Sequence, residues 1–269
     1  MGDGDTARPR RASSGLREHA PPAALAPYVD RTWTRAAPGP GPARSHLVLP
    51  DGCCDFIVAL GPEPVGFVVG PMTRAQSVAP RAGAYVGVRL QPAAAAALLR
   101  ERADALVDAR VELDAWWRDW PALVEAMARD ADGGVARMLA RVRTSVASAP
   151  PLDREIAHAV ARLREPGAPD VAELARELGR SRQHLTRRFR EQVGLAPKAF
   201  ARIARLQRLV AAMASTPPRW AALAAEHGYA DQAHLAHEFA GLVGLTPSAW
   251  WAGSNSTSPA APRRASSAA

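Results

Sequence analysis

The C-terminal half of the chain contains an internal repeat, which limits the folds that this half can adopt. The first copy contains Ala172, Leu174, Ala175, Glu177 and Gly179, which recur 49 residues later as Ala221, Leu223, Ala224, Glu226 and Gly228. A second set recurs at an offset of 50, in which His184, Leu185, Phe189, Val193, Gly194, Leu195 and Pro197 match His234, Leu235, Phe239, Val243, Gly244, Leu245 and Pro247. The change of offset falls at a predicted turn, where an extra residue disturbs packing least.

Each copy has the element order of a helix-turn-helix unit. A short helix with an apolar face is followed by a glycine, and Ser181 or Asp231 then supplies an N-cap for the next helix. That helix carries a leucine and a phenylalanine four residues apart and ends at a Gly-Leu-x-Pro sequence. Residues 198–214 form a predicted helix between the copies. The sequence therefore predicts an all-α C-terminal domain in which a linker helix joins two helix-turn-helix units.

Residues 152–251 resemble the DNA-binding domain of AraC-family transcription regulators, and the second copy, HGYADQAHLAHEFAGLVGLTPSAW, is the more typical one. In that family the second helices of the two units enter successive major-groove turns on one face of the duplex. The resemblance implies a sequence-specific transcription regulator whose partner is double-stranded DNA at a promoter or operator. It adds RNA polymerase and a small-molecule effector as candidate partners, and it leaves monomer and homodimer open.

The second helix of the first unit has a polar side that suits base recognition. Leu185 and Phe189 define its buried side, because residues four apart share a helix face. Glutamine and arginine make bidentate contacts with adenine and guanine edges. The opposite side matches the positions that contact DNA in the family, which assigns Gln183, Thr186 and Arg187 to bases and Arg182 and Arg190 to phosphates.

The second unit offers a different surface at the matching positions. Its base-reading positions are Ala233, Ala236 and His237, and alanine donates no side-chain hydrogen bond. Residues 170–208 carry ten basic and four acidic groups, whereas residues 209–252 carry one basic and three acidic groups. We therefore expect the first unit to supply most of the affinity and base specificity, and the second to set the docking.

The overall charge of +8 is weaker evidence than its local placement. Lys198 is the only lysine among 34 basic residues, and the chain is rich in Ala, Pro and Gly, as expected from a GC-rich coding sequence. Five arginines between positions 180 and 190 make the stronger case for an anionic partner. Two other functions stay open: a non-specific nucleoid-type DNA binder, and a thiol or small-molecule sensor whose DNA binding is secondary.

The N-terminal half has the pattern of short strands followed by helices, which gives an α+β fold class. Apolar runs predict strands at 46–49, 56–60, 67–69 and 85–90, with a turn at 50–52 and helices at 93–102 and 135–146. The predicted boundaries are a disordered tail at 1–15, a β-rich sensor or regulatory domain at 16–115, a helical connector at 116–149, the double helix-turn-helix domain at 150–252 and a disordered tail at 253–269.

The N-terminal region also resembles a domain found attached to AraC-type DNA-binding domains. The matching pieces are Leu25 to Val29 with Trp33, Leu49 to Cys53 with Asp55, Gly70-Pro71, Gly87 to Leu90, and Pro92. The resemblance implies a regulatory module controlled by an unidentified signal. The effector, the operator sequence, and the choice between activation and repression stay open. The helical segment 122–147 is a hypothetical transmitter, and the apolar stripe at 135–146 fits either a domain core or a dimer seam.

Two adjacent cysteines, Cys53 and Cys54, are the chain's only thiols. They form neither a disulfide framework nor a four-ligand metal site. Their position before an apolar strand favours burial over catalysis, and a thiol sensor at either residue is the remaining chemical hypothesis. We therefore expect no enzyme activity, no metal and no cofactor. The absence of a long apolar span and of a secretory signal in the sequence predicts a cytoplasmic protein without a membrane partner.

Overall fold

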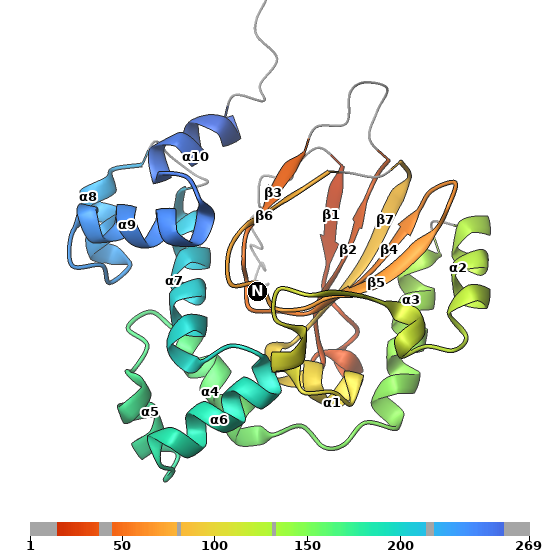
Figure 1. The fold of residues 1–269 in the computed structure, drawn as a ribbon, viewed down its shortest axis with the longest axis horizontal. Coiled ribbons are helices and arrows are strands. Elements are labelled where there is room, and N and C mark those ends of the chain that lie inside the picture. Colours follow the sequence, from red (N-terminus) through yellow and green to blue (C-terminus); the bar gives the residue numbers. More distant parts are fainter. Residues whose placement is uncertain (1–14, 38–44, 80–81, 131–132, 214–217, 256–269) are drawn as a thin grey trace, which may run out of the picture.

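The computed structural model describes residues 15–37, 45–79, 82–130, 133–213 and 218–255 (Figure 1). The tails predicted at 1–15 and 253–269 lie almost wholly outside these residues. Residues 253–255 differ from the prediction, because they continue the last helix, α10 (Pro247–Asn255).

An antiparallel sheet of six strands, in the order β1-β2-β7-β4-β5-β8, is the centre of the N-terminal domain. Its strands are β1 (Leu16–His19), β2 (Val29–Arg35), β4 (Asp55–Leu60), β5 (Val65–Val69), β7 (Ala84–Leu90) and β8 (Arg110–Glu112), and a separate pair consists of β3 (His46–Val48) and β6 (Gln76–Val78). The four predicted strands are confirmed as β3, β4, β5 and β7. The other four were missed, because strands such as β2, VDRTWTR, carry mostly polar side chains.

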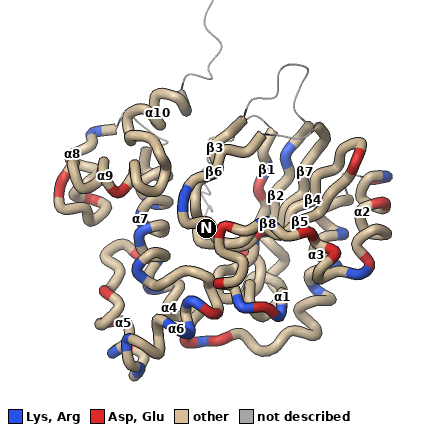
Figure 2. The backbone as a smooth tube through the Cα atoms, in the orientation of Figure 1, with Lys and Arg blue, Asp and Glu red and all other residues tan. Residues whose placement is uncertain are grey.

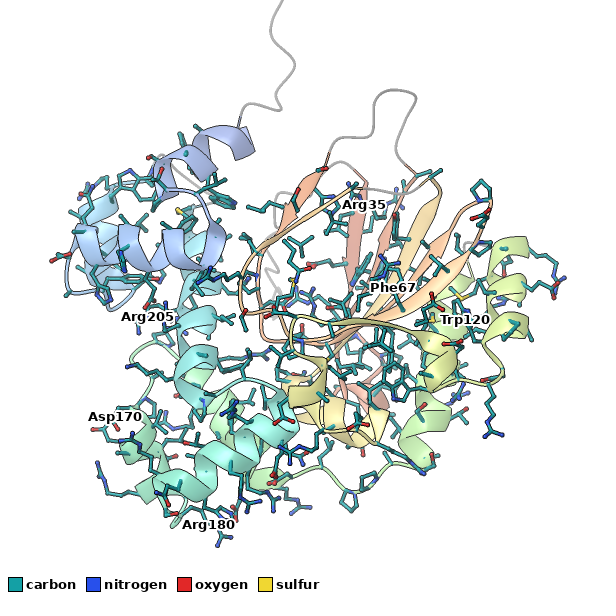
Figure 3. All side chains as sticks on the ribbon, viewed as in Figure 1. Arg35, Phe67, Trp120, Asp170, Arg180 and Arg205 are labelled. Carbon is teal, nitrogen blue, oxygen red and sulfur yellow. The ribbon has the colours of Figure 1, made fainter. Side chains whose placement is uncertain are left out.

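Helices and tryptophans cover the sheet and complete its core. Two helices, α2 (Trp120–Arg129) and α3 (Gly134–Ala147), lie along the sheet in Figure 1, and Met138 and Val142 of α3 are fully buried. The ring centroids of Trp117 and Phe56 are 4.7 Å apart, and Trp120 packs at the outer side of the domain (Figure 3). The 135–146 stripe is therefore domain core, and the segment predicted as a connector packs on the N-terminal sheet.

The helix predicted at 93–102 is shorter than expected. The chain forms a 3-10 turn η2 (Pro92–Ala94), a short helix α1 (Ala95–Leu99) and a second 3-10 turn η3 (Ala103–Leu106). Arg100, at φ 53°, adopts a left-handed conformation that ends α1. Two further 3-10 turns, η1 (Ala23–Leu25) and η4 (Leu113–Ala115), complete the domain.

The C-terminal domain contains the two predicted helix-turn-helix units. Its remaining helices are α4 (Arg154–Arg164), α5 (Val171–Glu177), α6 (Arg182–Val193), α7 (Pro197–Met213), α8 (Trp220–Glu226) and α9 (Gln232–Val243). Ser181 and Asp231 accept hydrogen bonds from the backbone N–H groups of His184 and His234, at 3.1 and 2.7 Å, which confirms both predicted N-caps. The predicted linker helix is α7, and it runs from the first unit to the second (Figure 1).

Candidate nucleic-acid interface

Helix α6 turns its predicted DNA-reading residues away from the core. Leu185 and Phe189 are 2% and 0% exposed, which confirms the predicted buried side. On the other side, Gln183 and Arg187 are exposed and Thr186 is half-buried. The structure thus brings together the three residues predicted to contact bases, and the N-cap at the preceding serine fixes where their helix starts.

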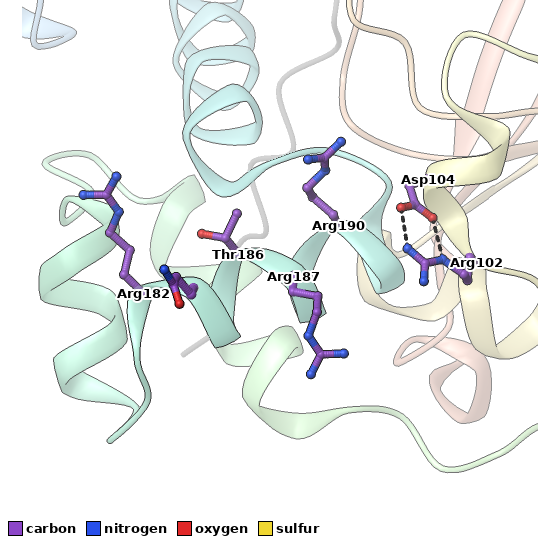
Figure 4. A pocket seen from close by; sticks show the side chains of 7 residues that line it. Arg102, Asp104, Arg182, Thr186, Arg187 and Arg190 are labelled. Atoms are coloured by element: carbon purple, nitrogen blue, oxygen red, sulfur yellow. Dashed lines mark hydrogen bonds and ion pairs between the residues drawn. The ribbon is translucent and has the colours of Figure 1, made fainter.

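The same side of α6 forms one wall of a hollow of about 550 Å³ (Figure 4). The lining residues from α6 are Arg182, Gln183, Thr186, Arg187 and Arg190. Arg102 and Asp104, from the N-terminal domain, complete the lining. Four of the described lining residues are arginines and one is an aspartate, and Glu191 beside the hollow pairs with Arg102 and Arg187. The basic groups still outnumber the acidic ones, so the hollow is electrostatically suited to an anion. The sequence did not identify Arg102 or Asp104, because no periodic pattern relates them to a helix about 80 residues further along the chain.

The five arginines between 180 and 190 divide into two groups. Arg180 pairs with Glu155 at 2.5 Å, and Arg188 pairs with Asp153, so both hold the first unit against α4. Figure 3 shows Arg180 at the outer end of this unit. The other three, at 182, 187 and 190, line the hollow. The sequence analysis used all five arginines as evidence for an anionic partner and assigned these three to DNA. The ion pairs of the other two with Glu155 and Asp153 depend on the fold.

The predicted base-reading face of α9 consists of two alanines and one histidine. Ala233 and His237 are exposed, Ala236 is half-buried, and Leu235 and Phe239 are fully buried on the opposite side. Figure 2 shows basic positions along α6 and α7, and acidic ones on α8 and α9. The two units therefore present the different surfaces that the sequence predicted.

A polar cluster beneath α9 stabilises the geometry of the second unit. Glu238 is 7% exposed, and its Oε2 accepts a hydrogen bond from Nε of Arg202 on α7 at 3.0 Å. His234 accepts a hydrogen bond on Nδ1 from the backbone N–H of Ala230, at 3.1 Å. His234 therefore ties the turn to α9.

The N-terminal domain packs directly against the C-terminal domain. Segments η2, α1 and η3 contact α6, and Ala93 belongs to the core of the C-terminal domain. Gln207 of α7 donates a hydrogen bond to the Pro50 carbonyl at 2.7 Å, and the Ala75 N–H donates one to the Leu242 carbonyl of α9 at 2.8 Å. The N-terminal domain thus touches the linker helix and both recognition helices.

A buried ion cluster supports the loop that makes part of this contact. Arg89 lies 2.8 Å from Asp51 and 3.2 Å from Asp55, and Trp33 donates a hydrogen bond to Asp55 at 3.0 Å. Burial lowers the pKa of Arg89, but the two carboxylates outweigh it and raise that pKa well above its ordinary value. These residues come from the N-terminal motifs, so the motifs build the surface on which the C-terminal domain rests.

Both cysteines are enclosed in this region. Cys53 and Cys54 are 4% and 1% exposed. Burial, followed by the charges of neighbouring aspartates, raises the pKa of each thiol above its ordinary value. A buried thiol with a raised pKa offers little thiolate to an oxidant. In this arrangement the pair has the properties of structural cysteines, and the thiol-sensor hypothesis lacks an accessible nucleophile.

The described ranges contain neither a candidate metal site nor a helix that could span a membrane. No group of three or more His, Cys, Asp or Glu residues there is placed to hold a metal ion. Among the described helices, none has the length and apolar character needed to cross a bilayer.

Two separate regions of the chain match protein families. Residues 17–112 match a domain of unknown function (DUF6597), and residues 174–252 match a helix-turn-helix domain. No curated protein matches the chain. Among solved structures, ToxT from Vibrio cholerae covers 88% of this chain and 98% of its own, at 9% identity and a TM-score of 0.43. A structure of unsaturated fatty acid bound wild-type ToxT from Vibrio cholerae strain SCE256 covers 90% and 96%, at 10% identity and a TM-score of 0.41.

Proposed function

Because the chain carries an AraC-type helix-turn-helix domain and is a DNA-binding transcription regulator, we propose that α6 reads the bases of its site, that α9 docks the second unit, and that the N-terminal domain controls both. A regulator of this family is not an enzyme. The observation that carries the proposal is the exposed row of polar and basic side chains on α6, opposite a fully buried Leu-Phe side.

The reading role of α6 follows from the side chains it exposes. Gln183 and Arg187 have the donor geometry for bidentate contacts with adenine and guanine edges. Arg187 is 62% exposed and forms an ion pair with Glu191 of the next turn, at 3.3 Å, and DNA can replace that ion pair. Arg182 and Arg190, near the two ends of the exposed side, are placed for phosphates.

The docking role of α9 follows from what its face lacks. Ala233 and Ala236 allow close approach to a groove and contact with a thymine methyl group, but they donate no side-chain hydrogen bond. His237 is the one polar side chain among the three predicted base-reading positions of this unit. We therefore assign the second unit a smaller share of base specificity than the first.

Control by the N-terminal domain follows from its contacts with α6, α7 and α9. A ligand that binds differently to two packing arrangements of the domains shifts the separation or orientation of the recognition helices. We place this coupling in η2, η3 and the loop at Pro50, because these segments touch the C-terminal domain, whereas α2 and α3 pack on the sheet. The signal we propose is a small-molecule effector.

We also propose where the protein acts and what its DNA site looks like. A regulator of promoters acts on DNA in the cytoplasm, beside RNA polymerase, and its site has two half-elements about one helical turn apart, roughly 34 Å. The boundary between sensor and DNA-binding region falls at 149–150 in this scheme.

The oligomeric state is a separate question. Sedimentation of the protein with and without its DNA site distinguishes a monomer from a homodimer.

The first test is selection of genomic fragments by the purified full-length protein at two salt concentrations. We expect a reproducible motif with two half-elements that is retained at the higher concentration. Binding without an enriched motif, which collapses as salt rises, contradicts the proposal and identifies a non-specific binder.

The second test compares Arg187→Ala with His237→Ala on the selected site. Arg187→Ala should weaken binding by about 1–3 kcal/mol and relax the preference at one position, because a bidentate base contact is lost. His237→Ala should weaken it less. A larger loss at His237 than at Arg187 reverses the roles of the two units, and no loss at either removes both from base recognition.

A further inference from the structure

Arg102 of the N-terminal domain lies beside the recognition helix of the first unit. It stands between α1 and η3, its side chain is 60% exposed, and it lines the same hollow as Arg182, Arg187 and Arg190 (Figure 4). None of the roles proposed above uses this residue. A positive group at this place extends the basic surface of α6 onto the other domain.

The backbone around Arg102 is fixed relative to α6 by packing. The next residue, Ala103, is fully buried, and η3 packs against α6. A Cβ at Gly194, the residue that ends α6, would lie 2.8 Å from the Ala103 carbonyl oxygen. The two segments are therefore in close contact, and the position of Arg102 follows that of α6.

Two carboxylates orient the side chain of Arg102. Its Nε and Nη2 donate to the carboxylate of Asp104 at 3.0 and 2.8 Å, and its Nη1 donates to Oε1 of Glu191 at 3.4 Å. The same Glu191 oxygen accepts a hydrogen bond from Arg187 at 3.3 Å. Arg102 is thus pre-oriented at the hollow, and one carboxylate links it to the predicted base-reading arginine.

The dimensions of α6 place its two ends near the DNA backbones. Twelve residues at about 1.5 Å each give a helix of about 18 Å, whereas the major groove is about 12 Å wide. Figure 4 shows Arg182 at one end of α6 and Arg190, followed by Arg102, toward the other. If the exposed side of α6 enters the groove, we expect one phosphate strand to pass near Arg190 and Arg102.

We propose that Arg102 is a phosphate contact supplied by the N-terminal domain, so that the DNA-binding surface spans both domains. The inference rests on the proposed function of α6 and adds a partner group for the N-terminal domain. It also gives a physical route for control, because any change in the packing of η3 on α6 moves a DNA-contacting charge.

The test measures binding of full-length Arg102→Ala to the selected duplex and to an unrelated duplex over a range of salt concentrations. We expect weaker binding on both duplexes by a similar factor, and a slope of log affinity against log salt that is shallower by about 1. Arg129→Ala is the matched control. It removes one charge from the N-terminal domain, its side chain is 71% exposed, and its helix α2 lies away from α6 in Figure 1.

Arg102→Lys separates charge from folding. A lysine keeps the positive group, so it should retain the wild-type salt slope, and melting curves of all variants report whether the fold is kept. Should Arg102→Ala fail to fold, Arg102→Gln removes the charge with a longer polar side chain and carries the same expectation.

Three results would overturn the proposal. In the first, the neutral variants keep the slope and affinity of wild type or of Arg129→Ala. In the second, they bind more tightly, which means that this segment obstructs DNA. In the third, they change base preference as Arg187→Ala does, which makes Arg102 a positioning residue acting through Glu191. A wild-type protein that selects no motif refutes the proposed function instead, so the two failures are distinct.

Discussion

Nη2 of Arg164, the last residue of α4 in the C-terminal domain, donates a hydrogen bond to Sγ of Cys53 in the N-terminal domain at 3.5 Å. The same guanidinium lies 4.0 Å from Asp30 and 5.8 Å from the ring centroid of Phe200. Three kinds of contact thus converge on one side chain that crosses the domain boundary. The thiol is covered by the partner domain, which makes its reactivity a measure of domain contact.

Thiol labelling therefore reports on this contact. In native wild-type protein we expect slow modification of both cysteines by a thiol reagent, because both are buried and burial raises their pKa values. Arg164→Ala should speed labelling at Cys53 and leave Cys54 slow, since the hydrogen bond of the arginine is to Cys53. Tandem mass spectrometry locates the modified thiol.

The exposed Arg129→Ala serves as the control for this experiment and should label at the wild-type rate. Rapid labelling of either thiol in native wild-type protein would contradict the buried arrangement and restore the thiol-sensor hypothesis.

Gly52 tests the fit between the domains. Its φ is +74°, and a Cβ there would lie 2.7 Å from Cε2 of Phe200 on α7. Gly167 has a similar φ of +68° with nothing within 4 Å of an added Cβ. An alanine at either position strains the backbone by about 1–3 kcal/mol. Only Gly52→Ala also overpacks the contact with Phe200, which should cost about 1–3 kcal/mol more.

We therefore expect Gly52→Ala to lower the free energy of unfolding more than Gly167→Ala does, as measured by urea denaturation. Equal losses in the two variants would mean that the loop at Gly52 is not pressed against Phe200 in solution.

Tyr229 makes the free energy of unfolding depend on pH in the alkaline range. Its side chain is buried, its hydroxyl has no hydrogen-bond partner among the described residues, and burial raises its pKa from 10.0 to about 12. Between these values the unfolded chain loses the phenolic proton first, so the free energy of unfolding falls as pH rises. The contribution is fully present below pH 10 and is lost as pH rises through the folded pKa.

Tyr229→Phe removes both the unpaired hydroxyl and this titration. We expect the variant to be at least as stable as wild type near neutral pH, and to gain on wild type between pH 10 and 12. Urea denaturation at several pH values measures the difference, and a constant difference across that range would show that Tyr229 titrates normally.

Local sequence pattern was sufficient to predict the helix-turn-helix units. Leu185, Phe189 and their repeats Leu235 and Phe239 are buried as predicted, because helical periodicity fixes which side chains share a face. Caps at Ser181 and Asp231 were equally predictable, since an N-cap bonds to backbone within three residues. The exposed face of α6 follows from the same periodicity, and its DNA-reading role stays a prediction.

Strands and domain contacts were predictable only in part. The apolar strands β4, β5 and β7 were found, whereas the polar β2 is a strand because β1 and β7 pair with it on either side. The apolar stripe at 135–146 fitted either a domain core or a dimer seam in the sequence, and its packing on the sheet makes it domain core. Strand pairing joins residues that are distant in sequence, so no local pattern records it.

Residue order alone contains the repeat and predicts the caps, the buried and exposed sides of α6 and α9, and the contrast in charge between the two units. All of these depend on neighbours within a few turns of one helix. Packing of the folded chain pairs Arg180 and Arg188 with residues at the start of α4, places Cys53 under Arg164, and brings Arg102 and Arg187 to the same carboxylate of Glu191. Each of these contacts is made when separately folded segments pack together, and it depends on the relative placement of whole elements, which helical and strand periodicity do not specify.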